Sequence, residues 1–167
     1  MTRASSTGNE SSPRETQGDG FALDDFLPYL LNQAAEASSH SFAAVYRREH
    51  GMTRTQWRVM ANLGRFGAMS ASEICAQAHI DKTKVSRAVA QLEAAGHLSR
   101  SPVAEDKRRE RLALTTEGRA VFARLGAKAL AFQADLTKAL GPERTALLET
   151  LLREVIALHR DEGDTRA

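Results

Sequence analysis

Short polar and basic side chains are concentrated in a predicted helix that begins after Asp81 and ends at Gly96. The positions that helical spacing turns outward there are Lys82, Thr83, Lys84, Ser86, Arg87, Ala90 and Gln91. Hydroxyl, amide and guanidinium groups can hydrogen-bond to the edges of DNA bases, and lysine and arginine neutralise phosphates. The solvated face of an ordinary amphipathic helix would carry similar charge. DNA contact is favoured because no large apolar side chain interrupts this set and because the next segment is also basic.

That next segment carries the second candidate site, centred on Asp106-Lys-Arg-Arg109 with Arg111 two residues beyond. Residues 82–119 contain nine basic and five acidic side chains, whereas the whole chain has a net charge of only +2. An arginine at a hairpin tip, whether Arg108, Arg109 or Arg111, can enter the narrow, electronegative minor groove, and Asp106 can support Arg108 in an extended pose. A soluble loop would also be charged. The alternative function is therefore a basic module that docks an acidic protein partner without contacting DNA.

Helix caps and tight turns predict the elements that position these side chains. Thr53-Arg-Thr-Gln56 and Ser70-Ala-Ser-Glu73 are capping-box patterns, and the first of these helices is expected to end before Gly64 and Gly67. His79-Ile-Asp81 predicts a tight turn in which Asp81 caps the following helix. Two short helices joined by a tight turn between Ser70 and Gly96 form a predicted helix-turn-helix.

A hairpin and a long helix are expected after Gly96. The pattern changes to alternation, with Leu98 and Arg100 on one side of a strand. A polar stretch from Pro102 to Arg111 follows, and Leu112 and Leu114 around Ala113 resume the alternation. The pattern predicts two strands around a charged tip. Thr115 or Thr116 then begins a long helix that ends at Gly141-Pro142.

Apolar side chains at both ends of the chain predict a subunit interface. The first long helix is expected over about 25–48, with Asp24 or Asp25 as its cap and Gly51 as its stop. The last helix carries an apolar stripe that is too wide for one neighbouring helix to cover: Leu147, Leu148, Leu151, Leu152, Val155, Ile156 and Leu158. Together with Phe26 and Leu30, the stripe predicts contact with a second copy of the chain.

Composition agrees with a mainly α fold that includes a small β-hairpin. Alanine and leucine number 46 among the 167 residues, against 10 for valine and isoleucine. Apart from Met1, residues 1–20 lack any large apolar side chain and are expected to form a flexible tail. Residues 21–167 are expected to form a single domain.

The sequence gives no indication of a membrane protein, a secreted protein or an enzyme. Its longest stretches without a charged residue are ten residues long, about half of what a membrane span needs. The single cysteine, Cys75, and the absence of a signal-like apolar segment predict a cytoplasmic protein. No catalytic motif is present, and five scattered histidines lack ligand spacing, so neither cofactor nor metal is expected. Cys75 is expected to face inward and pack like alanine rather than to sense redox state.

A second group of side chains suits a small ligand. Phe42, Tyr46, Arg47, Trp57 and Arg58 could line an apolar pocket with a cationic rim, which would suit an aromatic carboxylate or its coenzyme A thioester. The alternative is that the aromatic side chains belong to the core and the arginines to a solvated face. The sequence leaves both open.

The combined motifs resemble the MarR (multiple antibiotic resistance regulator) family over about residues 25–160. The segments that carry the resemblance are Thr53-Arg-Thr-Gln-Trp-Arg-Val59, Asp81-Lys-Thr-Lys-Val-Ser-Arg87, Gln91-Leu-Glu-Ala-Ala-Gly-His-Leu98, Arg100, Asp106-Lys-Arg108 and Leu112-Ala-Leu-Thr-Thr-Glu-Gly118. Glu110, between Arg109 and Arg111, departs from the family pattern and leaves open which arginine reaches the groove.

The resemblance implies a winged helix-turn-helix over 53–115, flanked by dimerisation helices at 21–50 and 116–162. It further implies a homodimer that binds a double-stranded operator, with the recognition helix in the major groove and the wing in the minor groove. Many members of the family respond to a small ligand, commonly an aromatic acid or an aryl thioester. The expected function is therefore a ligand-responsive transcriptional regulator, most simply a repressor.

Overall fold

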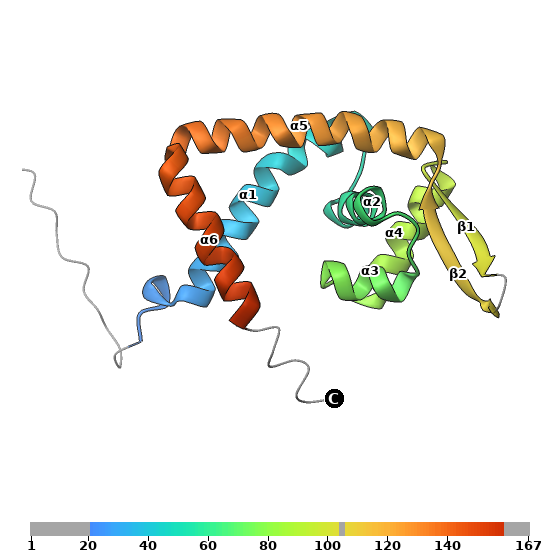
Figure 1. Cartoon of the computed structure of the whole chain (residues 1–167), viewed down its shortest axis with the longest axis horizontal. Helices are drawn as coiled ribbons and strands as arrows, with labels where there is room; N and C mark the ends of the chain where they lie inside the picture. Colours follow the sequence, from blue (N-terminus) through green and yellow to red (C-terminus); the bar gives the residue numbers. More distant parts are fainter. Residues whose placement is uncertain (1–20, 104–105, 159–167) are drawn as a thin grey trace, which may run out of the picture. The chain divides into compact units, whose positions relative to one another are not determined.

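The computed structural model describes residues 21–103 and 106–158, and for residues 103 and 106–109 it describes the backbone alone. It is mainly helical with one antiparallel hairpin (Figure 1), as the sequence predicts. The elements are a 3-10 helix η1 (Leu23–Asp25), α1 (Leu27–His50), α2 (Arg54–Phe66), α3 (Ala71–Ala78), α4 (Lys82–Ala94), β1 (Leu98–Val103), β2 (Asp106–Leu114), α5 (Thr116–Leu140) and α6 (Pro142–Leu158).

The chain divides into two compact units, Met1–Ser38 and Ser39–Ala167, with the boundary inside α1. In the first unit, Asp24 and Asp25 belong to η1 rather than capping the long helix. The extended backbone of Phe26 separates η1 from α1, which therefore begins two residues later than the sequence suggests. The second unit contains the helix-turn-helix, the hairpin and α6.

The predicted caps begin the helices of the second unit. The Thr53 hydroxyl accepts a hydrogen bond from the Gln56 amide, and the Gln56 side chain accepts one from the Thr53 amide, at 3.3 and 2.7 Å. Ser70 and Glu73 form the same reciprocal pair at the start of α3. Thr115, the first of the two expected candidates, caps α5 by accepting a bond from the Gly118 amide. These confirmed caps show that local sequence sets where the helices start.

The turn between α3 and α4 is closed by a residue in an uncommon conformation. His79 has φ 48° and ψ 51°, the left-handed region that side chains other than glycine rarely adopt. The Ile80 amide then donates to the Cys75 carbonyl at 3.2 Å, and Asp81 caps α4. This sharp turn lets both short helices pack on one core.

The core of the second unit lies where α2, α3 and α4 meet β1, β2 and α5. Its fully buried side chains include Tyr46, Val59, Met60, Ile74, Val85, Leu92, Leu112 and Leu125. Figure 1 shows α2 to α4 gathered along one side of α5, with the hairpin at the end where α5 begins. α5 is thus the element that joins the hairpin end to α6.

Two further element ends differ from the prediction, in α2 and in the hairpin. α2 continues through Gly64, where the missing side chain leaves room for the Phe122 ring, 2.6 Å from an added Cβ. The helix then ends at Phe66 with Gly67 as its C-cap, so the second of the two expected glycines is the stop. The strands also extend into the polar stretch, to Val103 and from Asp106, because backbone pairing in an exposed hairpin does not need apolar side chains.

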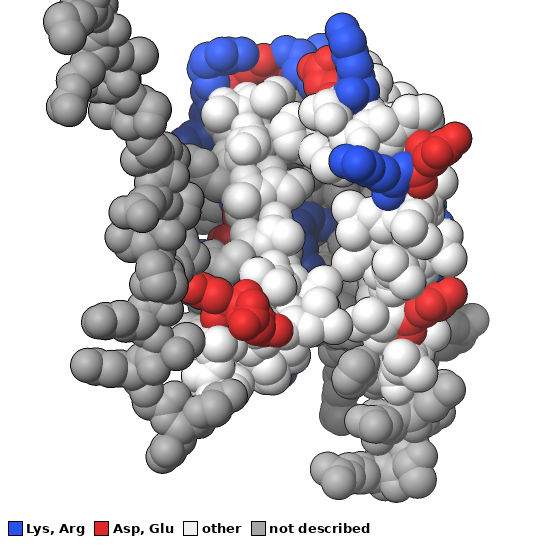
Figure 2. Space-filling model, turned by 90° about the vertical axis from the view of Figure 1, so that its left-hand side faces the viewer, with Lys and Arg blue, Asp and Glu red and all other residues white. Residues whose placement is uncertain are grey.

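The apolar stripe on α6 is exposed in the single chain. Leu147, Leu151 and Ile156 are 60%, 48% and 52% exposed, whereas Val155 is half-buried. Figure 2 shows the side of the molecule on which α6 lies, and much of the described surface there is free of charged residues. No helix in the described ranges is long and apolar enough to cross a membrane.

Candidate nucleic-acid interface

The helix α4 separates its buried and exposed side chains as a recognition helix must. Val85, Ala88, Val89 and Leu92 are buried in the core. All six polar side chains singled out from the sequence are exposed: Lys82, Thr83, Lys84, Ser86, Arg87 and Gln91. The structure therefore brings them together on one outward face.

Charges at the start of α4 are only partly neutralised within the protein. Asp81 accepts a hydrogen bond from the Lys84 amide at 2.9 Å, and this bond is the main reason why the pKa of its carboxyl is lowered. The Lys84 ammonium lies 3.2 Å from the same carboxylate. Neither Lys82 nor Arg87 takes part in an ion pair within the described ranges. Because an exposed ion pair of this kind is weak, the side chains of Lys82, Lys84 and Arg87 are all able to bind phosphates.

A groove of about 640 Å³ runs beside this face. It is lined by Thr53, Thr55, Asp81, Thr83, Lys84, Arg87, Ala88 and Gln91. Thr53 and Thr55 come from the start of α2 and were not among the predicted site residues. Their hydroxyl groups at a helix start, next to a basic helix, were the available signal.

At the base of the hairpin, Arg100 binds two carboxylates. Its Nε lies 2.8 Å from Glu93 of α4 and its Nη1 lies 3.0 Å from Glu110 of β2. The bond to Glu93, followed by the bond to Glu110, raises the pKa of this guanidinium. Glu93 therefore ties the hairpin to the recognition helix, and Glu110, the departure from the family pattern, holds Arg100 within the hairpin.

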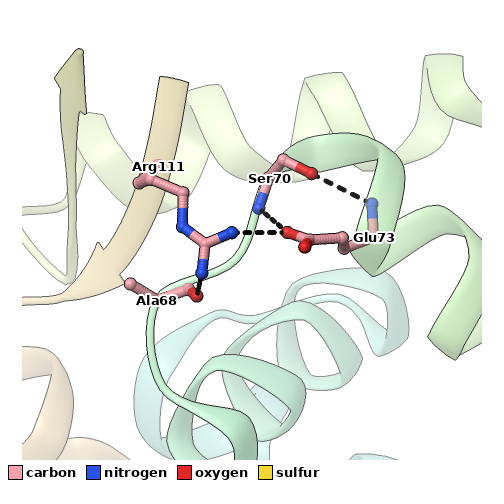
Figure 3. Close-up of polar contacts among 4 residues, drawn as sticks. All are labelled: Ala68, Ser70, Glu73 and Arg111. Atoms are coloured by element: carbon pink, nitrogen blue, oxygen red, sulfur yellow. Dashed lines mark hydrogen bonds and ion pairs between the residues drawn. The ribbon is translucent and has the colours of Figure 1, made fainter. Parts of the chain in front are cut away.

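Arg111 is the one predicted DNA-contacting arginine of the hairpin whose side chain the structure describes. Its Nη1 donates to Glu73 at 2.9 Å, and its Nη2 donates to the Ala68 carbonyl (Figure 3). Hydrogen bonds from Ser70, followed by the contact with Arg111, lower the pKa of the Glu73 carboxyl. The guanidinium is thus engaged within the protein. The side chains of Asp106, Arg108 and Arg109 lie outside the described residues, so their roles stay predictions.

The aromatic residues suggested for an effector pocket do meet. Phe42 contacts the rings of Tyr46 and Trp57, with centroid distances of 5.7 and 5.8 Å. Phe122 and Phe132 of α5, which the sequence argument did not include, complete the cluster. Their helical spacing in α5 was the signal that could have identified them.

The polar side chains predicted for this pocket lie in three different environments. Arg58 donates to the Ala78 carbonyl at the end of α3, and burial lowers its pKa. Arg47 is exposed near the end of α1. The Tyr46 hydroxyl is buried without a hydrogen-bond partner in the described ranges, and burial raises its pKa. The aromatic cluster therefore contains one unsatisfied polar group.

Known proteins share this architecture and sequence. Residues 50–109 match the MarR family profile. The HTH-type transcriptional regulator FarR of Neisseria gonorrhoeae is 30% identical over 125 residues, covering 75% of this chain and 85% of that protein. The homoprotocatechuate degradative operon repressor of Escherichia coli is 27% identical, covering 81% and 91%. The solved structure of NadR in complex with 4-hydroxyphenylacetate has a TM-score of 0.72 at 27% identity, covering 81% and 98%.

These similarities extend well beyond the helix-turn-helix. The match to FarR covers most of both chains, and the structural likeness to NadR covers 81% of this chain. Together with the capped helix-turn-helix and the paired hairpin, they establish that this chain belongs to the MarR family of transcriptional regulators.

Proposed function

We propose that the protein is a ligand-responsive repressor that binds a pseudo-palindromic DNA operator as a homodimer. The single observation that carries this proposal is the outward face of α4, where exposed short polar and basic side chains stand over a fully buried apolar face. That division suits insertion into a major groove. The proposed base and phosphate contacts are Lys82, Thr83, Lys84, Ser86, Arg87 and Gln91.

The hairpin is proposed to act as a wing in the minor groove. Arg108 or Arg109 would enter the groove, with Asp106 supporting the arginine. An arginine there would sense groove width, so Arg108→Ala should weaken binding most where the flanking sequence is A·T-rich. In this proposal α4 discriminates between bases, and the wing senses the shape of the minor groove.

The partner in the dimer is proposed to be a second copy packed on α6. Leu147, Leu148, Leu151, Leu152 and Ile156 are all exposed, and a monomer rarely leaves so continuous an apolar surface in water. A two-fold dimer would place its two recognition helices on half-sites roughly one helical turn apart.

The proposed effector is an aromatic carboxylate or its coenzyme A thioester. The buried, unpartnered Tyr46 hydroxyl in an aromatic cluster is a group that a ligand could satisfy, and Arg47 supplies a nearby exposed cation. The names of two similar proteins point the same way, since one represses a homoprotocatechuate operon and the other was solved with 4-hydroxyphenylacetate.

Gel-shift assays with genomic fragments at two salt concentrations test the DNA-binding proposal. We expect retention of a small set of fragments, with affinity falling steeply as salt rises because counterions are released from the phosphates. Binding without sequence preference or salt dependence would instead favour the alternative, a basic module that docks an acidic protein. Release of the retained fragment by an aromatic acid would then test the effector.

A further inference from the structure

Several hydrogen bonds attach β2 to the segment at the start of α3. The Met69 amide donates to the Leu112 carbonyl at 3.0 Å, and the Leu112 amide donates to the Met69 carbonyl at 2.7 Å. Next to this bridge, Arg111 reaches both Glu73 and the Ala68 carbonyl. Residues 68–73 and β2 are thus joined by four hydrogen bonds within a few residues.

A single carboxylate oxygen connects the cap of α3 with the hairpin. Oε2 of Glu73 accepts from the Ser70 amide at 2.6 Å and from Nη1 of Arg111 at 2.9 Å. The first bond belongs to the cap of α3, and the second belongs to the hairpin. Any tilt of the hairpin away from α3 must therefore break the bond between Arg111 and the oxygen that also caps the helix.

A second attachment acts on the other face of the hairpin. Arg100 is paired with Leu112 and Ser101 with Arg111, so Arg100 and Arg111 project from opposite faces of the two strands. Arg100 binds Glu93 of α4, while Arg111 binds Glu73 of α3. The two ion pairs hold the hairpin from both sides against the two helices of the helix-turn-helix.

We propose that Arg111 is a positioning residue that sets the angle of the wing through Glu73 and Ala68, and that it does not itself contact DNA. This inference rests on the proposed function, because the wing angle matters only if the hairpin enters a groove. Both ends of the guanidinium are already engaged in the protein, and leaving them would remove two of the four hydrogen bonds that join the hairpin to residues 68–73. A phosphate contact by Arg111 would thus undo the geometry that presents Arg108 and Arg109.

The Glu73→Gln variant distinguishes a positioning role of Arg111 from a simple effect of charge on DNA binding. Glutamine can still accept the hydrogen bond from the Ser70 amide and keep the capping box, but it loses the charge that pairs with Arg111. Removing a negative charge near DNA should tighten binding if only charge matters. The positioning role predicts the opposite, about three- to tenfold weaker operator binding, because the charge-assisted bond to the wing is lost. Glu117→Gln in the first turn of α5 is the matched control, and it should leave binding unchanged or slightly tighter.

Arg111→Gln should weaken operator binding by a similar factor, with the slope of log affinity against log salt unchanged. The double variant should bind no worse than either single variant, since both remove one contact. Arg111→Lys keeps the charge but can bond to only one of the two partners, so it should lose less operator affinity than Arg111→Gln. It also provides a second test if the glutamine variant does not fold. Hydroxyl-radical footprints should lose protection at the wing flanks but not at the centre of each half-site.

Two results would overturn the inference. The first is a slope of log affinity against log salt that is shallower by about 0.9 in Arg111→Gln, together with Glu73→Gln binding operator as tightly as the parent. Such a change in slope would mean that Arg111 contacts one phosphate. The second needs no DNA: hydrogen exchange at the Leu112 amide should speed up in both glutamine variants, and unchanged exchange would show that no such clamp exists. If the parent bound no operator, the proposed function would fail, and the exchange measurement would still decide the role of Arg111.

Discussion

The backbone of Gly118 lies directly against the carbonyl oxygen of His97. An added Cβ at Gly118 would stand 1.9 Å from that oxygen, far inside any allowed contact. The same carbonyl accepts a hydrogen bond from the Thr115 amide at 3.1 Å. The end of the recognition-helix segment and the start of α5 are therefore locked together at a point where only glycine fits.

Gly118→Ala should lower the free energy of unfolding by about 1–3 kcal/mol, because the methyl group must push the two backbone segments apart. Urea denaturation followed by circular dichroism measures the loss. Gly126→Ala is the matched control in the same helix, since an added Cβ there meets nothing within 4 Å. The control should be stabilised by about 0.5–1 kcal/mol, and equal behaviour of both variants would contradict the close approach.

His79→Val should lower the free energy of unfolding by about 1–2 kcal/mol, because a β-branched side chain opposes the left-handed conformation of the turn. His79→Asn, which tolerates that conformation, should stay close to the parent. Chemical denaturation of both variants checks the prediction. A valine variant as stable as the asparagine variant would mean that the turn has another conformation in solution.

Replacing Leu147 and Leu151 together by Asp should abolish dimerisation. Both side chains are exposed on one face of α6, so two carboxylates there would be buried without partners in a dimer. Light scattering after size exclusion should show monomers, or unfolded chain, with no operator binding. Arg153→Asp, on another face of α6, should remain dimeric, and a double variant that also remains dimeric would place the interface elsewhere.

Tyr46→Phe should raise the free energy of unfolding by about 1 kcal/mol, because it removes a buried hydroxyl that has no partner. The same change should reduce the thermal shift produced by an aromatic carboxylate. A Tyr46→Phe variant that is less stable than the parent would show that the hydroxyl already has a hydrogen-bond partner.

Local patterns predicted much of the fold because helix caps act within a few residues. Thr53, Ser70, Asp81 and Thr115 each begin the helix expected of them. The outward face of α4 also followed from spacing alone. These features depend on neighbours three or four positions apart, which the sequence displays directly.

Contacts between distant segments could not be predicted in this way. Arg111 meets Glu73 across 38 positions, and nothing in the basic stretch distinguishes it from an arginine that faces DNA. The sequence around Gly64 is typical of a helix end, and only the structure shows that the Phe122 ring packs against this glycine. In both cases the tertiary partner, rather than the local pattern, decides the role of the residue.

The most direct test of DNA contact by α4 is the operator affinity of Arg87→Ala beside that of Arg65→Ala. Both variants lose one exposed positive charge, but Arg87 lines the groove beside α4, whereas Arg65 stacks over Phe66 at the far end of α2. Fluorescence anisotropy should show Arg87→Ala binding weakened by about 1–3 kcal/mol, with relaxed discrimination at one operator position in each half-site if Arg87 contacts a base. Arg65→Ala should bind like the parent. Equal affinity of both variants and the parent would contradict the assignment of α4 as the recognition helix.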